Sequence, residues 1–345
     1  MVSIFKRTSQ QIARSQNGGR INRNKRVTFT FDGREYQGYE GDTLASALLA
    51  NDVHLVGRSF KYHRPRGILA AGSEEPNALI RLGKGAYAEP NLRATQIEIF
   101  DGLYAESQNR VPSLKFDVGA VNSVLGRFFP AGFYYKTFMW PASLWMTYEH
   151  VIRNAAGLGR VADDPNDPDR YEKLNAHCDV LIAGGGIAGI MAALQAGKSG
   201  ARVIFADEQN EFGGWVLGET DTLIDGQPAD KWVAAAMAEL ASIPEVTLLP
   251  RTTVFGYMDS NYLTLNERVT DHLPSRPAHL PRQRMWKVRA KQVVLAQGAH
   301  ERPLVFGGND LPGVMLSGAV RTYVNRYGVV PGNRTIVFTN NDDAY

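Results

Sequence analysis

Asp179-Val-Leu-Ile-Ala-Gly-Gly-Gly-Ile-Ala-Gly189 decides the fold, because it has the pattern of a buried strand that ends in a glycine-rich turn and continues into a helix. Gly184 would allow the tight turn out of the strand, and Gly186 would let the backbone approach a pyrophosphate without a Cβ in the way. Gly189 would let the helix pack closely against the sheet. The helix start then offers free N–H groups and a partial positive charge to the phosphates. The segment therefore predicts a dinucleotide-binding site.

Glycine-rich turns also occur as plain strand–helix connections, but the residues around this one favour a nucleotide site. Val180-Leu-Ile182 is a short apolar run suited to a buried parallel strand, and the apolar residues of 190–199 recur at helical spacing. A second strand ends at Asp207, which follows Gly184 by 23 residues (207 − 184). At an offset of roughly 20 residues, an acid in this motif meets a ribose hydroxyl. Because its carboxylate would repel a 2′-phosphate, Asp207 favours NAD over NADP.

The composition predicts two or three globular domains in these 345 residues, of which 44% are hydrophobic. A formal charge of +3 gives no reason to expect nucleic acid. Residues 1–25 predict a solvated basic arm, with an organelle transit peptide as the alternative. No apolar run approaches the roughly 18 residues of a membrane span. Cys178 is the only cysteine, which excludes an intramolecular disulfide and a cysteine-ligated iron–sulfur cluster and favours a reducing, cytoplasmic compartment.

The segment 26–110 predicts a small α+β domain. Arg26 to Tyr39 reads as two alternating strands joined at Asp32-Gly33, a strong hairpin signal. An amphipathic helix follows, with Asp42 or Thr43 as its cap. Further strands are expected at 78–82 and 95–100. This order resembles the β-grasp fold of 2Fe-2S plant-type ferredoxins without the cluster, because the loop after the helix carries Ala70-Ala-Gly-Ser-Glu-Glu-Pro-Asn77 where a cluster-bearing relative has cysteines. A structural or interface element is therefore expected here, not an electron carrier.

Residues 111–177 predict an aromatic-rich linker or interface segment. Phe128 to Pro141 is dense in aromatic residues and is interrupted by proline and glycine. Packing between two domains, a subunit interface and a membrane-surface segment all remain open for it. A polar linker over 163–170 leads to the next domain.

Residues 178–330 predict an α/β Rossmann-like domain. A helix is expected at Ala229–Ser242, with strands at 246–249, 252–255, 262–265 and 285–290, the later ones forming an antiparallel excursion from the parallel sheet. The closing strand, from Gln292, empties into a second glycine turn at Gly298. This is the plan of the two-dinucleotide flavoprotein reductases. Residues 331–345 resemble the first strand and turn of a further nucleotide-type unit that stops before its helix, so the sequence looks truncated.

The chain resembles the α subunit of heterotetrameric sarcosine oxidases. The stretches that carry the resemblance span nearly the whole chain: Phe29-Thr-Phe-Asp-Gly33, Gly57-Arg-Ser-Phe-Lys-Tyr-His-Arg-Pro-Arg-Gly67, Pro130-Ala-Gly-Phe-Tyr-Tyr-Lys-Thr-Phe-Met-Trp-Pro141 and Gly298-Ala-His-Glu-Arg-Pro303. Members of that family carry a further C-terminal half with a folate-binding domain, so the match concerns the N-terminal portion.

The resemblance implies a complex with β, γ and δ subunits that oxidises sarcosine, with electrons passing from FAD to FMN to oxygen and the one-carbon unit to tetrahydrofolate. It places FAD and the amine site on the β subunit, FMN at the α/β interface, zinc on the δ subunit, and NAD, without established redox work, in this chain. The implied NAD contacts are Gly184, Gly186, Ala188 and Gly189 at the pyrophosphate, Asp207, Glu208 and Gln209 at the ribose, Gly214 and Trp215, Val254 at the adenine, and Gly298.

Two residues depart from the expected pattern. Trp215 is bulkier than the small or hydroxylated residue expected after the Gly213-Gly214 turn, and Gln297 replaces the threonine of the usual Ala-Thr-Gly closing signature. Both departures bear on the geometry near the dinucleotide.

No catalytic constellation and no metal-ligand spacing is recognisable in the chain. His63 and His300 lie in family-like stretches beside arginines, and the basic segment Arg58–Arg66 could bind an anion or a neighbouring subunit, or be a solvated loop. Two other functions stay open. One is a stand-alone FAD-dependent NAD(P)H oxidoreductase of the disulfide-reductase plan, which lacks a Cys-x-x-Cys pair here, and the other is a non-catalytic interaction module.

Overall fold

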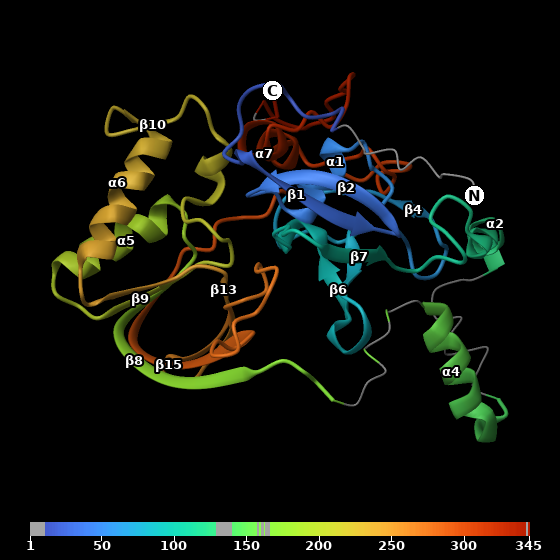
Figure 1. The fold of residues 1–345 in the computed structure, drawn as a ribbon, viewed down its shortest axis with the longest axis horizontal. Coiled ribbons are helices and arrows are strands. Elements are labelled where there is room, and N and C mark those ends of the chain that lie inside the picture. The colour runs from blue at the N-terminus through green and yellow to red at the C-terminus, as the bar shows by residue number, and fades with distance from the viewer. Residues whose placement is uncertain (1–10, 129–139, 157–158, 160–161, 163–165, 343) are drawn as a thin grey trace.

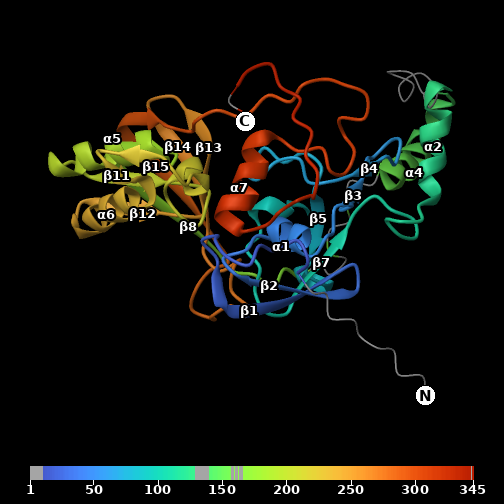
Figure 2. The ribbon, with the colours of Figure 1, turned by 90° about the horizontal axis from the view of Figure 1, so that it is seen from above.

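The computed structural model describes residues 11–128, 140–156, 159, 162, 166–342 and 344–345. Two units lie side by side, each built around one large β-sheet (Figure 1). The first unit contains the N-terminal strands, and the second contains the glycine-rich turn. Helix α7 (Ser317–Tyr327) lies between them when the molecule is seen from above (Figure 2).

The first unit is a five-stranded mixed sheet in the order β2-β1-β7-β5-β6. Neighbouring strands are antiparallel except β1 and β7, which are parallel. The predicted hairpin is confirmed, because Asp32 and Gly33 have φ of 48° and 74°, as a type I′ turn requires. The strands are β1 (Asn22–Phe31), β2 (Arg34–Glu40), β5 (Leu79–Leu82), β6 (Glu89–Arg93) and β7 (Leu103–Ser107), beside a small ladder of β3 (Gly57–Arg58) and β4 (Pro65–Arg66).

Helix α1 (Leu44–Ala50) is wholly buried beneath this sheet. Thr43 caps it, since its side-chain oxygen accepts from the Ser46 N–H at 3.2 Å while the Ser46 hydroxyl accepts from the Thr43 N–H at 3.0 Å. Of the two cap candidates, Thr43 is therefore the cap. Asp42 is buried beside it and binds the Ser46 hydroxyl at 2.7 Å.

Segments from both ends of the chain complete the first unit. Arg14 pairs with the buried Asp42 at 2.6 Å and forms a backbone bridge with Val329. Helix α7 buries Tyr323, whose hydroxyl donates to the carbonyl of Ala70 at 2.8 Å. Residues 11–25 thus differ from the solvated arm expected over 1–25, and residues 317–327, expected within a dinucleotide domain over 178–330, form a helix of the first unit. Both pack into the first unit because their apolar side chains line its core: Ile21, Leu316, Ala319, Tyr323, Tyr327 and Val329.

The second unit is a six-stranded sheet in the order β12-β9-β8-β15-β14-β13. The first four strands are parallel, and β13, β14 and β15 form the antiparallel excursion that the sequence predicted. Its elements are β8 (Tyr171–Ala183), α5 (Ile187–Lys198), β9 (Val203–Ala206), α6 (Ala229–Ser242), β12 (Val246–Leu249), β13 (Thr252–Met258), β14 (Tyr262–Arg268) and β15 (Gln283–Leu295). Strand β8 begins seven residues before the expected domain start at 178.

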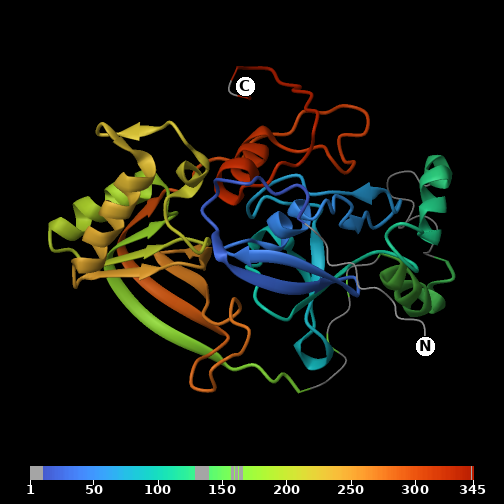
Figure 3. The ribbon, with the colours of Figure 1, turned by 45° about the horizontal axis from the view of Figure 1, so that its top comes forward.

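Helices α5 and α6 pack side by side on one face of this sheet (Figure 3). Ile182 and Phe205 point to that face, whereas their neighbours Leu181 and Ile204 point to the opposite face, against the meander residues Leu263 and Val288. Because alternate residues of β8 and β9 are buried on both sides, these strands are continuous apolar runs, as expected for a parallel sheet.

The prediction of a strand at 95–100 is wrong. Residues Ala94–Gln96 form a 3₁₀ turn (η2), and the backbone after it pairs with the start of α1 through a single bridge between Thr43 and Glu98. Buried Ile97 and Ile99 alternate with half-buried positions for that reason, not because they belong to a sheet. Strands β6 and β7, which the sequence analysis did not predict, occupy the sheet positions instead.

The region 111–177 contains short helices that the sequence analysis did not predict. They are η3 (Val118–Ala120), α2 (Val121–Val124), η4 (Leu125–Phe128), η5 (Ala142–Leu144) and α4 (Trp145–Ala156). Most of the aromatic stretch 128–141 lies outside the described residues. Short elements elsewhere are η1 (Gly85–Tyr87), η6 (Gly214–Gly218), β10 (Leu223–Ile224) and β11 (Gln227–Pro228).

The expected strand in 331–345 does not form within the described part of this tail. Ile336 is 94% exposed and Phe338 is 63% exposed, with Phe338 resting edge-on against Phe306. Much of the apolar surface of the described part of this tail therefore stays uncovered.

Candidate nucleotide site

The glycine-rich turn joins β8 to α5, and at two of its glycines other backbone atoms occupy the space where a side chain would lie. Gly184 has φ of 109°, and a Cβ there would lie 2.3 Å from the carbonyl oxygen of Ala296, just beyond β15. A Cβ on Gly189 would lie 1.9 Å from the carbonyl oxygen of Gly184, so the helix rests directly on the turn. At Gly186, in contrast, no atom lies within 4 Å of the Cβ position. The turn is therefore open to a ligand at Gly186.

Helix α5 begins at this open side. Its N-cap is Gly186, which supplies no side-chain oxygen to the N–H groups of the first turn. The first turn contains no acidic residue, and Ala188 within it is exposed. Free N–H groups and the positive end of the helix dipole at an open surface suit an anionic group such as a pyrophosphate.

Asp207 follows β9, and its carboxylate holds the turn in shape. Oδ2 accepts from the Gly185 N–H at 2.5 Å, and Oδ1 accepts from the Gln209 N–H at 2.7 Å. Burial raises the pKa of Asp207, and these two N–H groups lower it without cancelling the rise. Each carboxylate oxygen can accept a second hydrogen bond. Asp207 can therefore serve a ribose hydroxyl while it supports the backbone beside it.

The other two residues expected at the ribose turn their side chains toward the first unit. Oε2 of Glu208 accepts from Gln96 at 3.4 Å, and Oε1 of Gln209 accepts from Arg326 at 2.5 Å. Of the three expected ribose residues, the structure thus brings only the Asp207 side chain to the glycine turn. The loop 208–211 forms part of the contact between the two units.

Arginines hold the same loop from a second side. The guanidinium of Arg251 binds both carboxylate oxygens of Glu98, at 2.5 and 2.8 Å. The backbone N–H of Arg251 donates to the carbonyl of Gln209 at 2.8 Å. Arg268 donates to the carbonyl of Glu208 at 2.7 Å. Burial raises the pKa of the Glu98 carboxyl, but the hydrogen bonds and the charge of Arg251 outweigh burial, and the pKa lies below its usual value.

These interface residues were missed by the sequence analysis. Glu98 and Arg251 are 153 residues apart, and Arg326 and Gln209 are 117 residues apart. No local pattern marks such pairs. Only a comparison of paired changes across many related sequences would have carried a signal for them.

Two further expected contacts are the glycines Gly214 and Gly298. A Cβ on Gly214 would lie 2.9 Å from the Cα of Gly186, so the Gly213-Gly214 segment touches the turn. Gly298, with φ of 73°, comes two residues after Ala296, the residue that touches Gly184. The structure thus brings Gly214 to the turn, whereas Gly298 follows a segment that touches it.

The last two expected contacts face elsewhere. Trp215 is 66% exposed, and its ring lies 4.4 Å from the guanidinium carbon of Arg321. The side chain of Val254 packs against the core beneath the sheet. The backbone of β13 nevertheless reaches the site, because the Thr252 N–H donates to the carbonyl of Asp207 at 2.7 Å.

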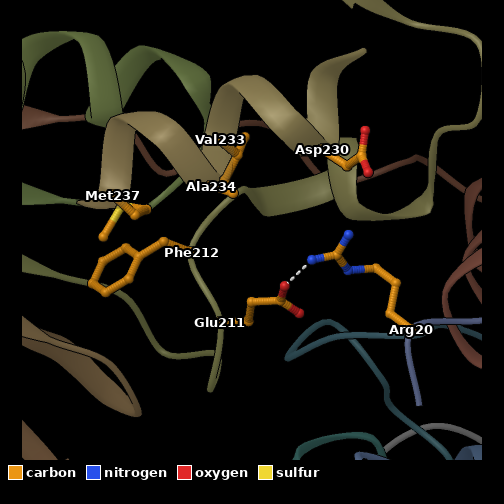
Figure 4. A pocket seen from close by; sticks show the side chains of 7 residues that line it. All are labelled: Arg20, Glu211, Phe212, Asp230, Val233, Ala234 and Met237. Atoms are coloured by element: carbon orange, nitrogen blue, oxygen red, sulfur yellow. Dashed lines mark hydrogen bonds and ion pairs between the residues drawn. The ribbon is translucent and has the colours of Figure 1, made fainter. Parts of the chain in front are cut away.

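A hollow of about 270 Å³ lies beside the loop after Asp207 (Figure 4). Arg20 and Glu211 form an ion pair across it, and its apolar side is made by Phe212 and residues of α6. Phe212 also packs under the turn, because a Cβ on Gly185 would lie 2.6 Å from its ring. The lining contains no residue of the glycine turn itself, so this hollow is not the place where a pyrophosphate would lie.

The basic segment Arg58–Arg66 makes its contacts within the chain. Arg64 binds both oxygens of Asp310 at 2.6 Å, and Arg66 pairs with the same carboxylate. His63 is buried with its Nδ1 2.7 Å from Asp117, whereas His300 is exposed. The contacts of Arg64, Arg66 and His63 make the segment a packing element of the first unit and favour neither a free anion site nor a solvated loop.

Within the part of the chain that the structure describes, no cluster of three or more His, Cys, Asp or Glu side chains could hold a metal ion. No described helix has the length and apolar character needed to cross a membrane.

Two family models match the two units. Residues 24–110 match a 2Fe-2S iron-sulfur cluster binding domain, and residues 179–258 match an FAD dependent oxidoreductase. The crystal structure of L-proline dehydrogenase from P. horikoshii has a similar fold, with a TM-score of 0.60 and 23% identity over 90% of this chain and 48% of that one. The fold and the two matches thus point to a ferredoxin-type domain joined to a Rossmann-like domain similar to FAD-dependent oxidoreductases.

In sequence, the chain is similar to sarcosine oxidase subunit alpha. It is 57% identical to that subunit from Rhizobium meliloti (strain 1021) over 95% of this chain and 33% of the relative. It is 41% identical to the one from Corynebacterium sp. (strain U-96) over 97% of this chain and 30% of the relative. The chain spans about a third of the length of these relatives. It is homologous to a portion of sarcosine oxidase subunit alpha, which confirms the resemblance predicted from the sequence.

Proposed function

We propose that this chain is the cofactor-binding N-terminal portion of a sarcosine oxidase α subunit. The complex would convert sarcosine to glycine, pass the one-carbon unit to tetrahydrofolate and pass electrons to oxygen. The observation that carries the proposal is the 57% identity to a relative of that name along 95% of the chain. The chain would act as a scaffold and would be inactive alone, because the described side chains at the glycine turn hold backbone and would bind nucleotide but include no acid–base pair or nucleophile.

The dinucleotide proposed for the glycine turn is NAD. The backbone of Gly184, Gly186, Ala188 and Gly189 would hold the pyrophosphate, and Asp207 the adenosine ribose. The open space at Gly186 and the uncapped start of α5 fit such a group. NAD would be a resident ligand without a redox step in this chain. FAD is the alternative, since it shares the ADP half and the match over residues 179–258 is to an FAD dependent oxidoreductase.

The first unit is proposed to be a β-grasp domain, over residues 26–110, that carries no iron–sulfur cluster. Its parallel pairing of the first and last strands, β1 and β7, with α1 packed beneath them, is the arrangement expected of that fold. The only cysteine of the chain, Cys178, lies outside this domain. Since such clusters are held by cysteine thiolates, the domain has no ligands for one.

The partners proposed are the β, γ and δ subunits, which would supply FAD, FMN and the amine site in the cytoplasm. The exposed apolar side chains near α2 and α4 are a candidate contact surface: Phe116, Val118, Val121, Val124, Trp140, Leu144 and Met146.

Mass spectrometry of the nucleotide released from the purified chain tests the cofactor assignment. NAD is expected, whereas FAD would favour the stand-alone NAD(P)H oxidoreductase and an empty site would favour a non-catalytic interaction module. Peroxide production is the second measurement. The chain with FAD, FMN and NAD but no partner should produce no sarcosine-dependent peroxide, and such production would overturn the scaffold assignment.

A further inference from the structure

We propose that Arg326, carried by α7 in the first unit, positions the loop 208–211 and thereby sets the affinity of the dinucleotide site. The ferredoxin-type unit would then control nucleotide binding by contact, without carrying electrons. The affinity part of this inference rests on the proposed dinucleotide function. The ordering of the loop by Arg326 does not.

Arg326 reaches three consecutive side chains of the loop. The nitrogen Nη1 donates to Oε1 of Gln209 at 2.5 Å. The nitrogen Nη2 donates to Oδ1 of Asn210 at 3.2 Å and lies 3.8 Å from the carboxylate of Glu211. The side chain is buried. A planar guanidinium can serve several acceptors in a fixed geometry, which a lysine ammonium cannot do in the same way.

The arginine is held by the first unit. Tyr323 and Tyr327, on the same helix, are buried in the core of that unit, and their rings lie 6.0 Å apart. The carbonyl of Arg326 accepts from the Arg20 N–H at 2.6 Å. The donor therefore belongs to a packed core, while the acceptors belong to a surface loop of the other unit.

A short chain of contacts connects Arg326 to the glycine turn. Arg326 binds the side chain of Gln209, the Gln209 N–H donates to Asp207 at 2.7 Å, and Asp207 accepts from the Gly185 N–H at 2.5 Å. Displacing Gln209 would therefore displace the acid that holds the turn. Asn210 adds a second link between this loop and the first unit, because its side chain donates to Glu98 at 3.0 Å.

A purely structural role would make Arg326 one of several arginines that join the two units. Arg282 provides the comparison. Its side chain has the same exposure, 10%, and it joins Glu89 of the first unit to Asp169 and Asp271 of the second. None of the hydrogen bonds or ion pairs that Arg282 forms with described residues involves the loop 208–211. A comparison of the two arginines can therefore distinguish a residue that holds the two units together from one that also positions the loop.

The test compares R326M and R282M in the full chain by thermal unfolding, by hydrogen exchange of residues 207–212 without nucleotide, and by calorimetric titration with NAD. R326M should exchange faster at 208–211 and bind NAD at least about tenfold more weakly, a loss of about 1.4 kcal/mol. R282M should lower the melting temperature while its loop exchange stays unchanged and its NAD affinity stays within about threefold of the unmodified chain.

Unchanged loop exchange in R326M, or equal acceleration in R282M, would overturn the proposal. If R326M does not fold, R326K takes its place under the same criteria, because it keeps the positive charge but lacks the planar fork whose two separate nitrogens reach Gln209 and Asn210. If the unmodified chain binds no dinucleotide, the proposed function fails, while the exchange measurement still decides whether Arg326 orders the loop.

Discussion

Replacing Gly186 by alanine should separate nucleotide binding from stability. The site has room for the new methyl group, since no atom lies within 4 Å of the Cβ position, and φ of −72° suits alanine. Replacing glycine by alanine stabilises the fold by about 0.4–1 kcal/mol because the unfolded chain loses conformational freedom. Alanine is a poorer N-cap than glycine, which lowers the stability by a similar amount. The free energy of unfolding should therefore change by less than about 1 kcal/mol.

Binding should suffer because that methyl group would occupy the space where a pyrophosphate approaches the backbone. A charge-assisted hydrogen bond is worth about 1.5–3 kcal/mol. Loss of one such bond from the N–H groups of α5 weakens NAD by at least about tenfold. Calorimetric titration gives the dissociation constant, and urea unfolding gives the stability of the same preparation.

Gly189→Ala is the contrasting variant. Its Cβ would lie 1.9 Å from the Gly184 carbonyl oxygen, a backbone atom that cannot swing away. Overpacking of this kind costs about 1–3 kcal/mol, so both stability and binding should fall. Gly307→Ala is the control, because it also adds a methyl group in open space but is not among the expected nucleotide contacts. NAD binding by Gly186→Ala as tight as by the unmodified chain would refute the reasoning, as would a loss of stability equal to that of Gly189→Ala.

Asp207→Asn should weaken NAD by about 1–3 kcal/mol, and the unmodified chain should prefer NAD to NADP; equal calorimetric affinities for both would contradict this. The purified chain should contain no iron or acid-labile sulfide, and stoichiometric amounts of either would contradict the cluster-free domain. Trp140→Ala, at a side chain that is 84% exposed, should weaken assembly with the partner subunits and leave NAD binding unchanged, as measured by co-purification and calorimetry. The fold lowers the pKa of Glu98, so its ion pair with Arg251 stabilises the folded chain above the usual carboxyl pKa of 4.5. This stabilisation is lost as the pH falls through the pKa of the folded state. Urea unfolding should therefore show that Glu98→Gln loses less stability in acid than the unmodified chain.

Elements set by local chemistry could be predicted from the sequence. The hairpin at Asp32-Gly33 depends on two residues that tolerate positive φ, and α6 begins and ends where the sequence placed it, at Ala229 and Ser242. The glycine turn was recognisable because a buried strand, a turn and a helix must follow one another in it within a few residues. In each case the information lies within about twenty residues of chain.

Elements set by distant contacts could not be predicted in the same way. Residues 95–100 alternate like a strand because Ile97 and Ile99 enter the core beside α1, so the period of two reports burial and not sheet pairing. Helix α7 has an amphipathic pattern, but nothing in that pattern says which unit its apolar face will meet. Its position follows from the space that the first unit offers to Tyr323.

The interface gives the first unit a structural role beside the glycine turn that needs no cysteine. Gln96 and Glu98 lie in the short segment between β6 and β7 and contact the loop that follows Asp207, either directly or through Arg251 and Arg268. Loss of a metal cluster from another loop of the unit would leave these contacts in place. What they require is the sheet that carries residues 94–99 and the core that holds α7. The contacts at the loop after Asp207 therefore depend on the fold of the first unit and not on a metal cluster in it.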